Sequence, residues 1–255
     1  MVSGIAAPLS RRIRYIFRRI HAESRGKEVL ELQLKIDPEL AQRLPFLTLG
    51  LLQVEGLENG PATAALQALV DATVSQARAE LQLEEISRLP AIAGWRKALK
   101  ALGTDPARYR VSSERLLRRI VKGDGLPRVS LIVDLVNVWS AASGLPIGLY
   151  DADRLEGDTL TFGAGRPGER YRTLAGTDME TLGKPVLRDG AGPCGSPITD
   201  SDRTATHGGT RRCVAVIFGP PLYDRDEFER HVELLADWFR HFTTGRVTAR
   251  EYVVS

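Results

Sequence analysis

Residues 129–153, VSLIVDLVNVWSAASGLPIGLYDAD, constrain the fold more than any other stretch of the chain. Ile132, Leu135 and Trp139 recur at helical spacing, so the predicted helix 129–143 has an apolar face that we expect to be buried. Gly144 and Pro146 then end the helix. Residues 147–150 alternate as a short strand, so the stretch predicts a core helix that turns sharply into a sheet.

A polar stripe follows the same predicted helix. Asp134, Asn137 and Ser140 are spaced three residues apart and therefore share one helix face beside the apolar one. Polar side chains near a core need hydrogen-bond partners. The stripe therefore either lines a functional site or holds neighbouring loops in place.

Periodicity along the rest of the chain predicts an α+β fold, with a helical N-terminal half packed on a mixed or antiparallel sheet of the C-terminal half. Further helices are expected at residues 62–89, 90–102 and 224–242, and one begins at a cap formed by Ser112 or Ser113. Strands are expected at 30–36, 46–54, 159–162, 185–188 and 213–218. Residues 190–209 are predicted as a long polar loop, and residues 243–255 as a tail or an edge strand.

The composition excludes several classes of protein. At 255 residues with 43% hydrophobic and 26% charged residues, the chain is an ordinary globular protein. No apolar run approaches the ~20 residues of a membrane span, so no membrane contact is predicted. Cys194 and Cys213 are too few for a disulfide scaffold and, even with His207, do not make a zinc site. We therefore expect a cytoplasmic protein without a metal or cofactor.

The positive charge is concentrated at the N-terminus. Residues 1–28 carry seven Lys/Arg against two Glu, a net charge of +5, whereas the whole chain is +3 and the remainder is therefore −2. The segment is amphipathic, and three interpretations stay open: an RNA-contacting arm, a targeting-like segment, or a loosely attached extension. For the first, the expected tRNA-binding residues are Arg11, Arg12, Arg14, Arg18 and Arg19.

The motif VDLVNVWSAASGLPIGLYDADRL at residues 133–155 resembles the tRNA-editing module of bacterial phenylalanyl-tRNA synthetase β subunits, the B-three/B-four domain. That module has a VD-x-x-N helix, a Gly-x-Pro break and a strand ending in D-x-D. Further matching residues follow the family order on both sides: Ser112, Leu116, Arg119, Ile120, Gly123, Pro127, then Gly168, Glu169, Leu174, Gly176, Asp189, Thr210 and the run 213–218. The resemblance covers roughly residues 88–220. It implies an editing domain at 29–245 between the extension 1–28 and a tail 246–255, in a free-standing monomeric member.

The resemblance also implies an activity. Editing modules hydrolyse the ester that joins a wrong amino acid to the 3′ end of tRNA, so the chain is expected to be a trans-editing aminoacyl-tRNA deacylase. The family has a histidine at the position of Gly148 and a glutamate at about the position of Val216. The loss of both argues against tyrosine on tRNA-Phe as the substrate, and the loss of the large imidazole predicts an enlarged pocket. The resemblance to related free-standing proteins further implies a substrate that carries a non-protein amino acid, such as the arginine analogue canavanine. The alternative is a non-catalytic module that binds tRNA or an amino acid.

The polar loop at residues 200–207 completes the predicted site. Its functional interpretation is the wall of an aminoacyl pocket facing the stripe on the helix, and the alternative is a local turn with an ion pair. Expected catalytic residues are Asn137, Ser140, Thr204 and His207, which would hold a ribose hydroxyl or orient the attacking water. Expected substrate-binding residues are Asp134, Gly148, Tyr150, Asp200, Ser201, Asp202 and Arg203. Asp200 or Asp202 would contact an amine or a cationic side chain, and Arg203 would hold one carboxylate by a bidentate pair or meet the terminal phosphate.

Overall fold

Two four-stranded sheets organise residues 32–255, the part of the chain that the computed structural model describes. The first has the order β10-β2-β9-β3, with β10 (Arg246–Val254), β2 (Thr48–Glu55), β9 (Arg212–Gly219) and β3 (Ile147–Asp151), and all its neighbours are antiparallel. The second has the order β1-β4-β7-β8, with β1 (Gln33–Ile36), β4 (Thr159–Ala164), β7 (Pro185–Asp189) and β8 (Gly192–Gly195). Only the β1–β4 pair is parallel in that sheet. A hairpin of β5 (Arg170–Arg172) and β6 (Asp178–Glu180) completes the strands of the described part.

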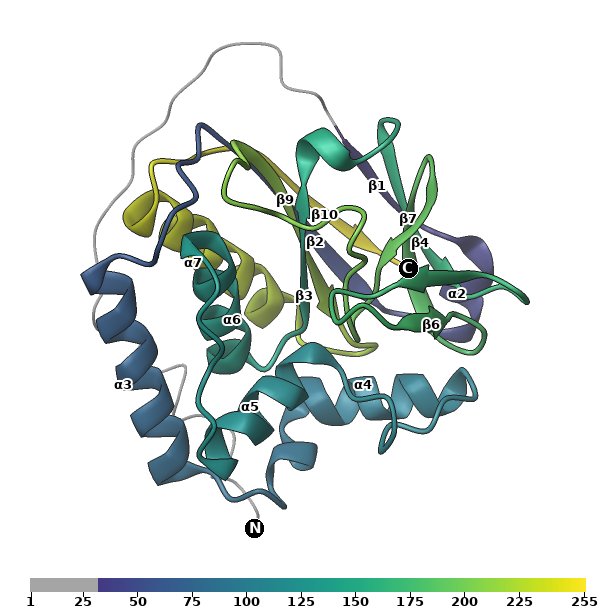
Figure 1. Cartoon of the computed structure of the whole chain (residues 1–255). Helices are drawn as coiled ribbons and strands as arrows, with labels where there is room; N and C mark the ends of the chain where they lie inside the picture. The colour runs from purple at the N-terminus through teal and green to yellow at the C-terminus, as the bar shows by residue number, and fades with distance from the viewer. Residues whose placement is uncertain (1–31) are drawn as a thin grey trace.

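Helices cover one face of the first sheet. The central one is α6 (Leu131–Ser143), which packs against α3 (Ala64–Glu80), α5 (Ser112–Lys122) and α7 (Arg225–Phe242). Helix α4 (Pro90–Ala101) runs below the sheets in the view of Figure 1. The short elements are α2 (Pro38–Arg43) and the 3₁₀ turns η1 (Ile86–Arg88) and η2 (Ala152–Arg154). The fold is therefore α+β in one domain, as predicted, although β2 shows that the sheets take strands from both halves of the chain.

The central helix α6 is buried, as its apolar periodicity predicts. Ile132, Leu135 and Trp139 are fully buried among α3, α5 and α7, and the Trp139 indole donates to the His231 carbonyl oxygen at 3.1 Å. Gly144 ends the helix in the left-handed conformation at φ 74°, which a glycine adopts without strain. The chain then enters β3, whose five residues are all buried.

Strand β9 separates the two cores of the domain. Cys213, Ala215 and Ile217 face the helices, whereas the alternate residues Val214 and Phe218 face the second sheet. Both faces of β9 are buried, so its sequence is a continuous apolar run rather than an alternating one.

Three local predictions are wrong. The helix expected at 62–89 ends at Glu80, because Leu81 is extended and Ile86 must turn back to fill the core. Neither Ser112 nor Ser113 caps α5: Val111 occupies the N-cap, and both serine hydroxyls lack a hydrogen-bond partner within the described residues. The expected loop 190–209 contains β8, since Gly192 at φ 118° turns the chain into a hairpin with β7.

The C-terminal segment is an edge strand rather than a separate tail. Residues of β10 pair with β2 along its whole length, from Arg246 opposite Glu55 to Val254 opposite Thr48. Within residues 32–255, no helix combines the length and apolarity needed to span a membrane, and no group of His, Cys, Asp and Glu is arranged to hold a metal ion.

Candidate functional site

A cleft of about 640 Å³ opens between α5, α6, β3 and the loop of residues 196–206. Residues from each element line it: Ser112, Arg115, Leu116, Arg119, Val133, Val136, Asn137, Ser140, Ile147, Leu149, Ser196, Thr199, Asp200, Ala205 and Thr206, with Val129 and Leu174 exposed at its rim. The polar stripe on α6 and the start of the polar loop thus meet in one concave surface, although more than fifty residues separate them in sequence.

Asp200 is the carboxyl group of the cleft. One of its oxygens accepts the Leu149 backbone N–H at 3.1 Å, and the other accepts the Tyr150 hydroxyl at 3.0 Å. Burial raises the pKa of Asp200 to about 7, although these hydrogen bonds and the charge of Arg115 act in the opposite direction. The group therefore changes charge near neutral pH, which suits a proton acceptor or a partner for a cation.

Two arginines of α5, Arg115 and Arg119, line the same cleft as Asp200. Arg115 donates to the Ile198 carbonyl oxygen and so ties α5 to the loop. Desolvation lowers the pKa of Arg115, and the nearby Asp200 carboxylate opposes that change. Arg119 lies one turn further along the same helix. The cleft therefore offers both a carboxyl group and guanidinium donors.

Asn137 and Ser140 share the cleft but differ in what their side chains can do. The Asn137 amide makes no hydrogen bond within the described residues and is half-buried in the cleft wall, so both its donor and its acceptor are available to a ligand. The Ser140 hydroxyl is fully buried and donates to the Leu145 carbonyl oxygen at 2.7 Å. Ser140 therefore stabilises the Gly-x-Pro turn and contributes mainly shape to the cleft.

Gly148 does not enlarge the cleft. A Cβ atom at this position would lie 2.1 Å from the Tyr150 hydroxyl oxygen and 2.9 Å from the Asp200 Oδ1 atom, so the tyrosine hydroxyl already fills that space. Gly195 meets the same two groups, at 2.4 Å and 2.6 Å. Val216, which lies opposite Gly148 in the sheet, is fully buried. The two glycines therefore make room for the Tyr150–Asp200 hydrogen bond.

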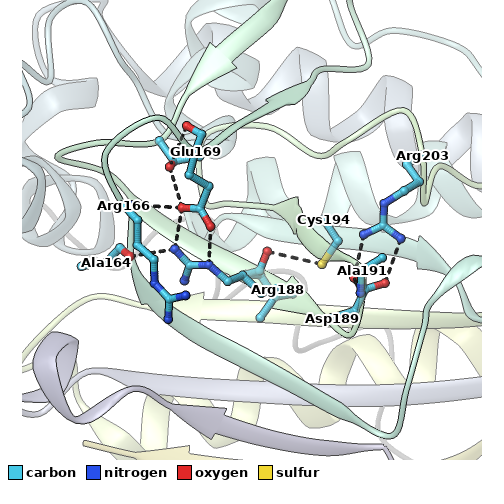
Figure 2. Close-up of polar contacts among 10 residues, drawn as sticks. Ala164, Arg166, Glu169, Arg188, Asp189, Ala191, Cys194 and Arg203 are labelled. Carbon is cyan, nitrogen blue, oxygen red and sulfur yellow. Dashed lines mark hydrogen bonds and ion pairs between the residues drawn. The ribbon is translucent and has the colours of Figure 1, made fainter.

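Asp202 and Arg203 point away from the cleft, in contrast to the prediction. Asp202 is exposed and pairs with Arg172 at 3.3 Å. Arg203 does form a bidentate pair, but with Asp189 of β7, at 2.7 and 2.9 Å (Figure 2). The Asp189 side chain is fully buried, so this pair attaches the loop to the second sheet and leaves no guanidinium for a phosphate.

Four other expected site residues have local structural contacts outside the cleft. The Asp134 carboxylate accepts the Val129 N–H at 2.8 Å, and the buried Thr204 hydroxyl donates to the Cys194 carbonyl oxygen at 3.2 Å. The Ser201 hydroxyl accepts the Arg203 N–H at 3.2 Å. His207 lies 3.2 Å from Asp151, and its Nδ1 atom accepts the Gly209 N–H.

Sequence reasoning missed the side of the cleft that α5 provides. Arg115 and Arg119 line that side, and their helical spacing also describes an ordinary solvated helix face. Thr199 and Thr206 of the loop also line the cleft. The arginines at positions 11, 12, 14, 18 and 19, expected to bind tRNA, lie outside the described residues.

A second groove, of about 560 Å³, lies between α6 and α7. It is lined by five carboxylates, those of Asp226, Glu227, Glu229, Glu233 and Asp237, with Arg230 and His231 as the basic residues of its lining. Such a surface repels anionic ligands. The cleft at α5 is therefore the better candidate for a site that binds a phosphate-bearing molecule.

Comparison with known proteins identifies relatives of this domain. The B3/4 domain family model matches residues 94–222, just over half of the chain. Phenylalanine–tRNA ligase β subunits of Rhodospirillum rubrum and Gloeobacter violaceus are 41% identical over 73 residues and 32% identical over 113 residues. These alignments cover 28% and 43% of this chain but only 9% and 14% of the relatives.

Among solved structures, an N-terminal fragment of the phenylalanyl-tRNA synthetase β subunit from Pyrococcus horikoshii is similar, with a TM-score of 0.49 and 14% identity. The match covers 96% of this chain and 61% of that fragment. The family match spans α5, α6, β3 and the polar loop, the elements that build the cleft. The chain belongs to the B3/4 domain family.

Proposed function

We propose that this protein is a trans-editing aminoacyl-tRNA deacylase, which hydrolyses the ester between a wrong amino acid and the 3′ end of a tRNA. Membership of the B3/4 family and similarity to phenylalanine–tRNA ligase β subunits support a tRNA substrate. The observation that carries the proposal is the cleft itself, where the carboxyl group of Asp200, the unpaired amide of Asn137 and the guanidinium of Arg115 gather on one concave surface. Such a protein would act in the cytoplasm, where aminoacyl-tRNA is made.

The chemistry needs positioning more than a strong nucleophile, because an aminoacyl ester is already activated. Water attacks the ester carbonyl, the carbon–oxygen bond to the ribose breaks, and a proton passes from the water to the departing ribose oxygen. The Asn137 amide and the Arg115 guanidinium are donors suited to the oxyanion that develops on the carbonyl oxygen. A neighbouring ribose hydroxyl can relay the proton, so binding geometry supplies much of the rate.

Asp200 gives the site its preference for a cationic group. Its carboxyl is held by two hydrogen bonds against β3, so it is fixed before the substrate binds. We propose that the carboxylate pairs with the substrate's α-ammonium group or with a cationic side chain, such as that of an arginine analogue like canavanine. Binding a cation would keep Asp200 ionised at neutral pH, although in the free cleft burial outweighs the two hydrogen bonds and the charge of Arg115 and raises its pKa to about 7.

A deacylation screen tests the proposal. Purified protein is incubated with a panel of mischarged tRNAs, including cationic and non-protein amino acids, and the surviving ester is measured over time. The proposal predicts faster hydrolysis of at least one mischarged tRNA, with the correctly charged tRNA spared. Binding without faster hydrolysis of any ester would instead identify a non-catalytic module that binds tRNA or an amino acid.

A further inference from the structure

Positive charge in the described part of the chain is concentrated on α4, α5 and the segments that follow each of them. Residues 96–128 hold ten Lys/Arg against three Asp/Glu, a net charge of +7. The described residues outside this segment are net acidic. This charge forms part of the wall of the cleft, because α5 contributes Arg115 and Arg119 to its lining.

One face of α5 carries a basic stripe, defined here as Arg115, Arg119 and Lys122. Their spacing of four and three residues places them on a single helix face, and Ser112 precedes them on the same face. All three are exposed. None of them forms an ion pair with another residue of the described chain. Asp200 is the anion that lies near the stripe, beside Arg115, and within the described residues no ion pair neutralises Arg119 or Lys122.

The neighbouring face of α5 has an anion, but it is occupied. Glu114 is fully buried and forms ion pairs with Arg96 at 3.1 Å and Arg118 at 2.9 Å, with Arg110 at 3.6 Å. Three guanidinium groups surround one carboxylate, so the cluster keeps a net charge of +2. The Glu114 carboxylate is thus unavailable to the basic stripe, and the net charge of the cluster around it adds to the positive potential of the surface.

The stripe leads out of the cleft. The first residue of α5, Ser112, donates its N–H to the Pro197 carbonyl oxygen of the cleft loop, and the far end of the helix is held to α3, where Arg78 donates to the Gly123 carbonyl oxygen. From Arg115 to Lys122 the helix rises about 10 Å, at about 1.5 Å per residue. That length corresponds to about three nucleotide steps of a stacked strand at about 3.4 Å each.

We propose that the basic stripe of α5 binds the backbone phosphates of the single-stranded end of an RNA whose terminal nucleotide enters the cleft. This inference rests on the proposed function, since it takes the substrate to be a tRNA. It places the RNA contact on the folded domain beside the cleft, in addition to any contact made by residues 1–28. Phosphate contacts of this kind set affinity and register and carry little base specificity.

The experiment measures RNA binding separately from hydrolysis. Full-length wild type and the double variant Arg119→Gln/Lys122→Gln are titrated against fluorescently labelled, uncharged tRNA across a series of KCl concentrations. The matched control is Lys35→Gln/Arg211→Gln, which removes the same charge from exposed positions outside the cleft. A triple variant that adds Arg115→Gln extends the series, and the melting temperature of each variant shows that it is folded.

The stripe variant is expected to bind tRNA roughly tenfold more weakly than wild type. The slope of log K plotted against log salt concentration is expected to become shallower by about 1.4, because the variant loses two phosphate contacts and each single-strand contact contributes about 0.7. The control is expected to keep the wild-type slope. Equal losses in both variants, or none in either, would overturn the inference and locate RNA binding elsewhere.

Three further outcomes are informative, and the first and the last of them separate this inference from the proposed function. If wild type hydrolyses a mischarged tRNA but the stripe variants bind RNA normally, the surface assignment fails while the function stands. If wild type binds phosphatidylserine vesicles and no RNA, the stripe is a membrane contact and the inference is refuted. If RNA binding depends on the stripe but wild type hydrolyses no ester, the inference about the RNA-binding surface stands and the proposed deacylase function fails.

Discussion

Replacing Asp200 with Asn distinguishes the effect of this buried carboxyl group on stability from its effect on activity. In the wild type the group accepts hydrogen bonds from the Leu149 N–H and the Tyr150 hydroxyl, and burial raises its pKa from 3.8 to about 7. Asn keeps the size and can still accept the Leu149 hydrogen bond, but it carries no charge at any pH. The variant therefore tests whether the carboxylate serves the fold or a ligand.

The sign of the effect on stability follows from linkage. A carboxyl whose pKa is raised by folding binds more protons in the native state than in the unfolded state between pH 3.8 and about 7, so its contribution to stability falls over that window and stays constant above it. The pKa change corresponds to at most about 4 kcal/mol at pH 8, and we expect about 2 kcal/mol because the cleft admits water. In the variant, loss of the hydrogen bond from the Tyr150 hydroxyl offsets about 1 kcal/mol of this gain in stability.

Asp200→Asn should therefore be about 1 kcal/mol more stable than wild type at pH 8 and within about 1 kcal/mol of it at pH 5. Activity should move the other way, with kcat/KM about ten- to a thousandfold lower, because the cationic group of the substrate loses its partner. Urea denaturation at both pH values gives the first result, and hydrolysis of the substrate found in the screen gives the second. A variant that is several kcal/mol less stable at pH 8, or one that keeps full activity, would refute this account of Asp200.

Three other substitutions test neighbouring parts of the site. Asn137→Ala should lower kcat by about tenfold or more at an unchanged melting temperature, because its amide has no partner in the described fold; a matching loss of stability would contradict this. Gly148→Ala should destabilise the protein by about 1–3 kcal/mol in urea denaturation, since the new methyl collides with a tyrosine hydroxyl, whereas the control Gly60→Ala meets no atom within 4 Å and should have little effect. Arg203→Ala should reduce the free energy of unfolding by about 3 kcal/mol because it leaves a buried carboxylate unpaired, and the exposed Arg172→Ala should change it by less than about 0.5 kcal/mol; equal effects would show that burial does not matter here.

The parts of the fold that could be predicted from sequence are those set by local periodicity. The apolar repeat of residues 129–143 specifies α6, and Gly144 specifies its end, because only the local chain decides both. The helix predicted through residue 89 fails for the opposite reason. Nothing local stops α3 after Glu80, and the chain turns there because Ile86 fills a core built by distant elements.

The candidate site was predictable in outline but not in detail. Asp200 and Asp202 are two residues apart and chemically identical, yet Asp200 lies in the cleft and Asp202 on the surface beside Arg172. The partner of Arg203 is Asp189, fourteen residues earlier on β7, and no sequence pattern identifies that pair. From sequence, Arg115 is indistinguishable from a residue on a solvated helix face, and only the tertiary structure places it in the cleft.

The central claim, that the cleft hydrolyses an aminoacyl ester, is tested most directly by the half-life of that ester. One mischarged tRNA carrying a cationic non-protein amino acid is incubated alone, with wild type, and with Asp200→Asn, at equal protein concentrations and with the tRNA below saturation. The account predicts that wild type shortens the half-life severalfold or more and that the variant leaves it close to the value without protein. An ester that survives equally long in all three samples, while the wild type demonstrably binds the tRNA, would contradict it.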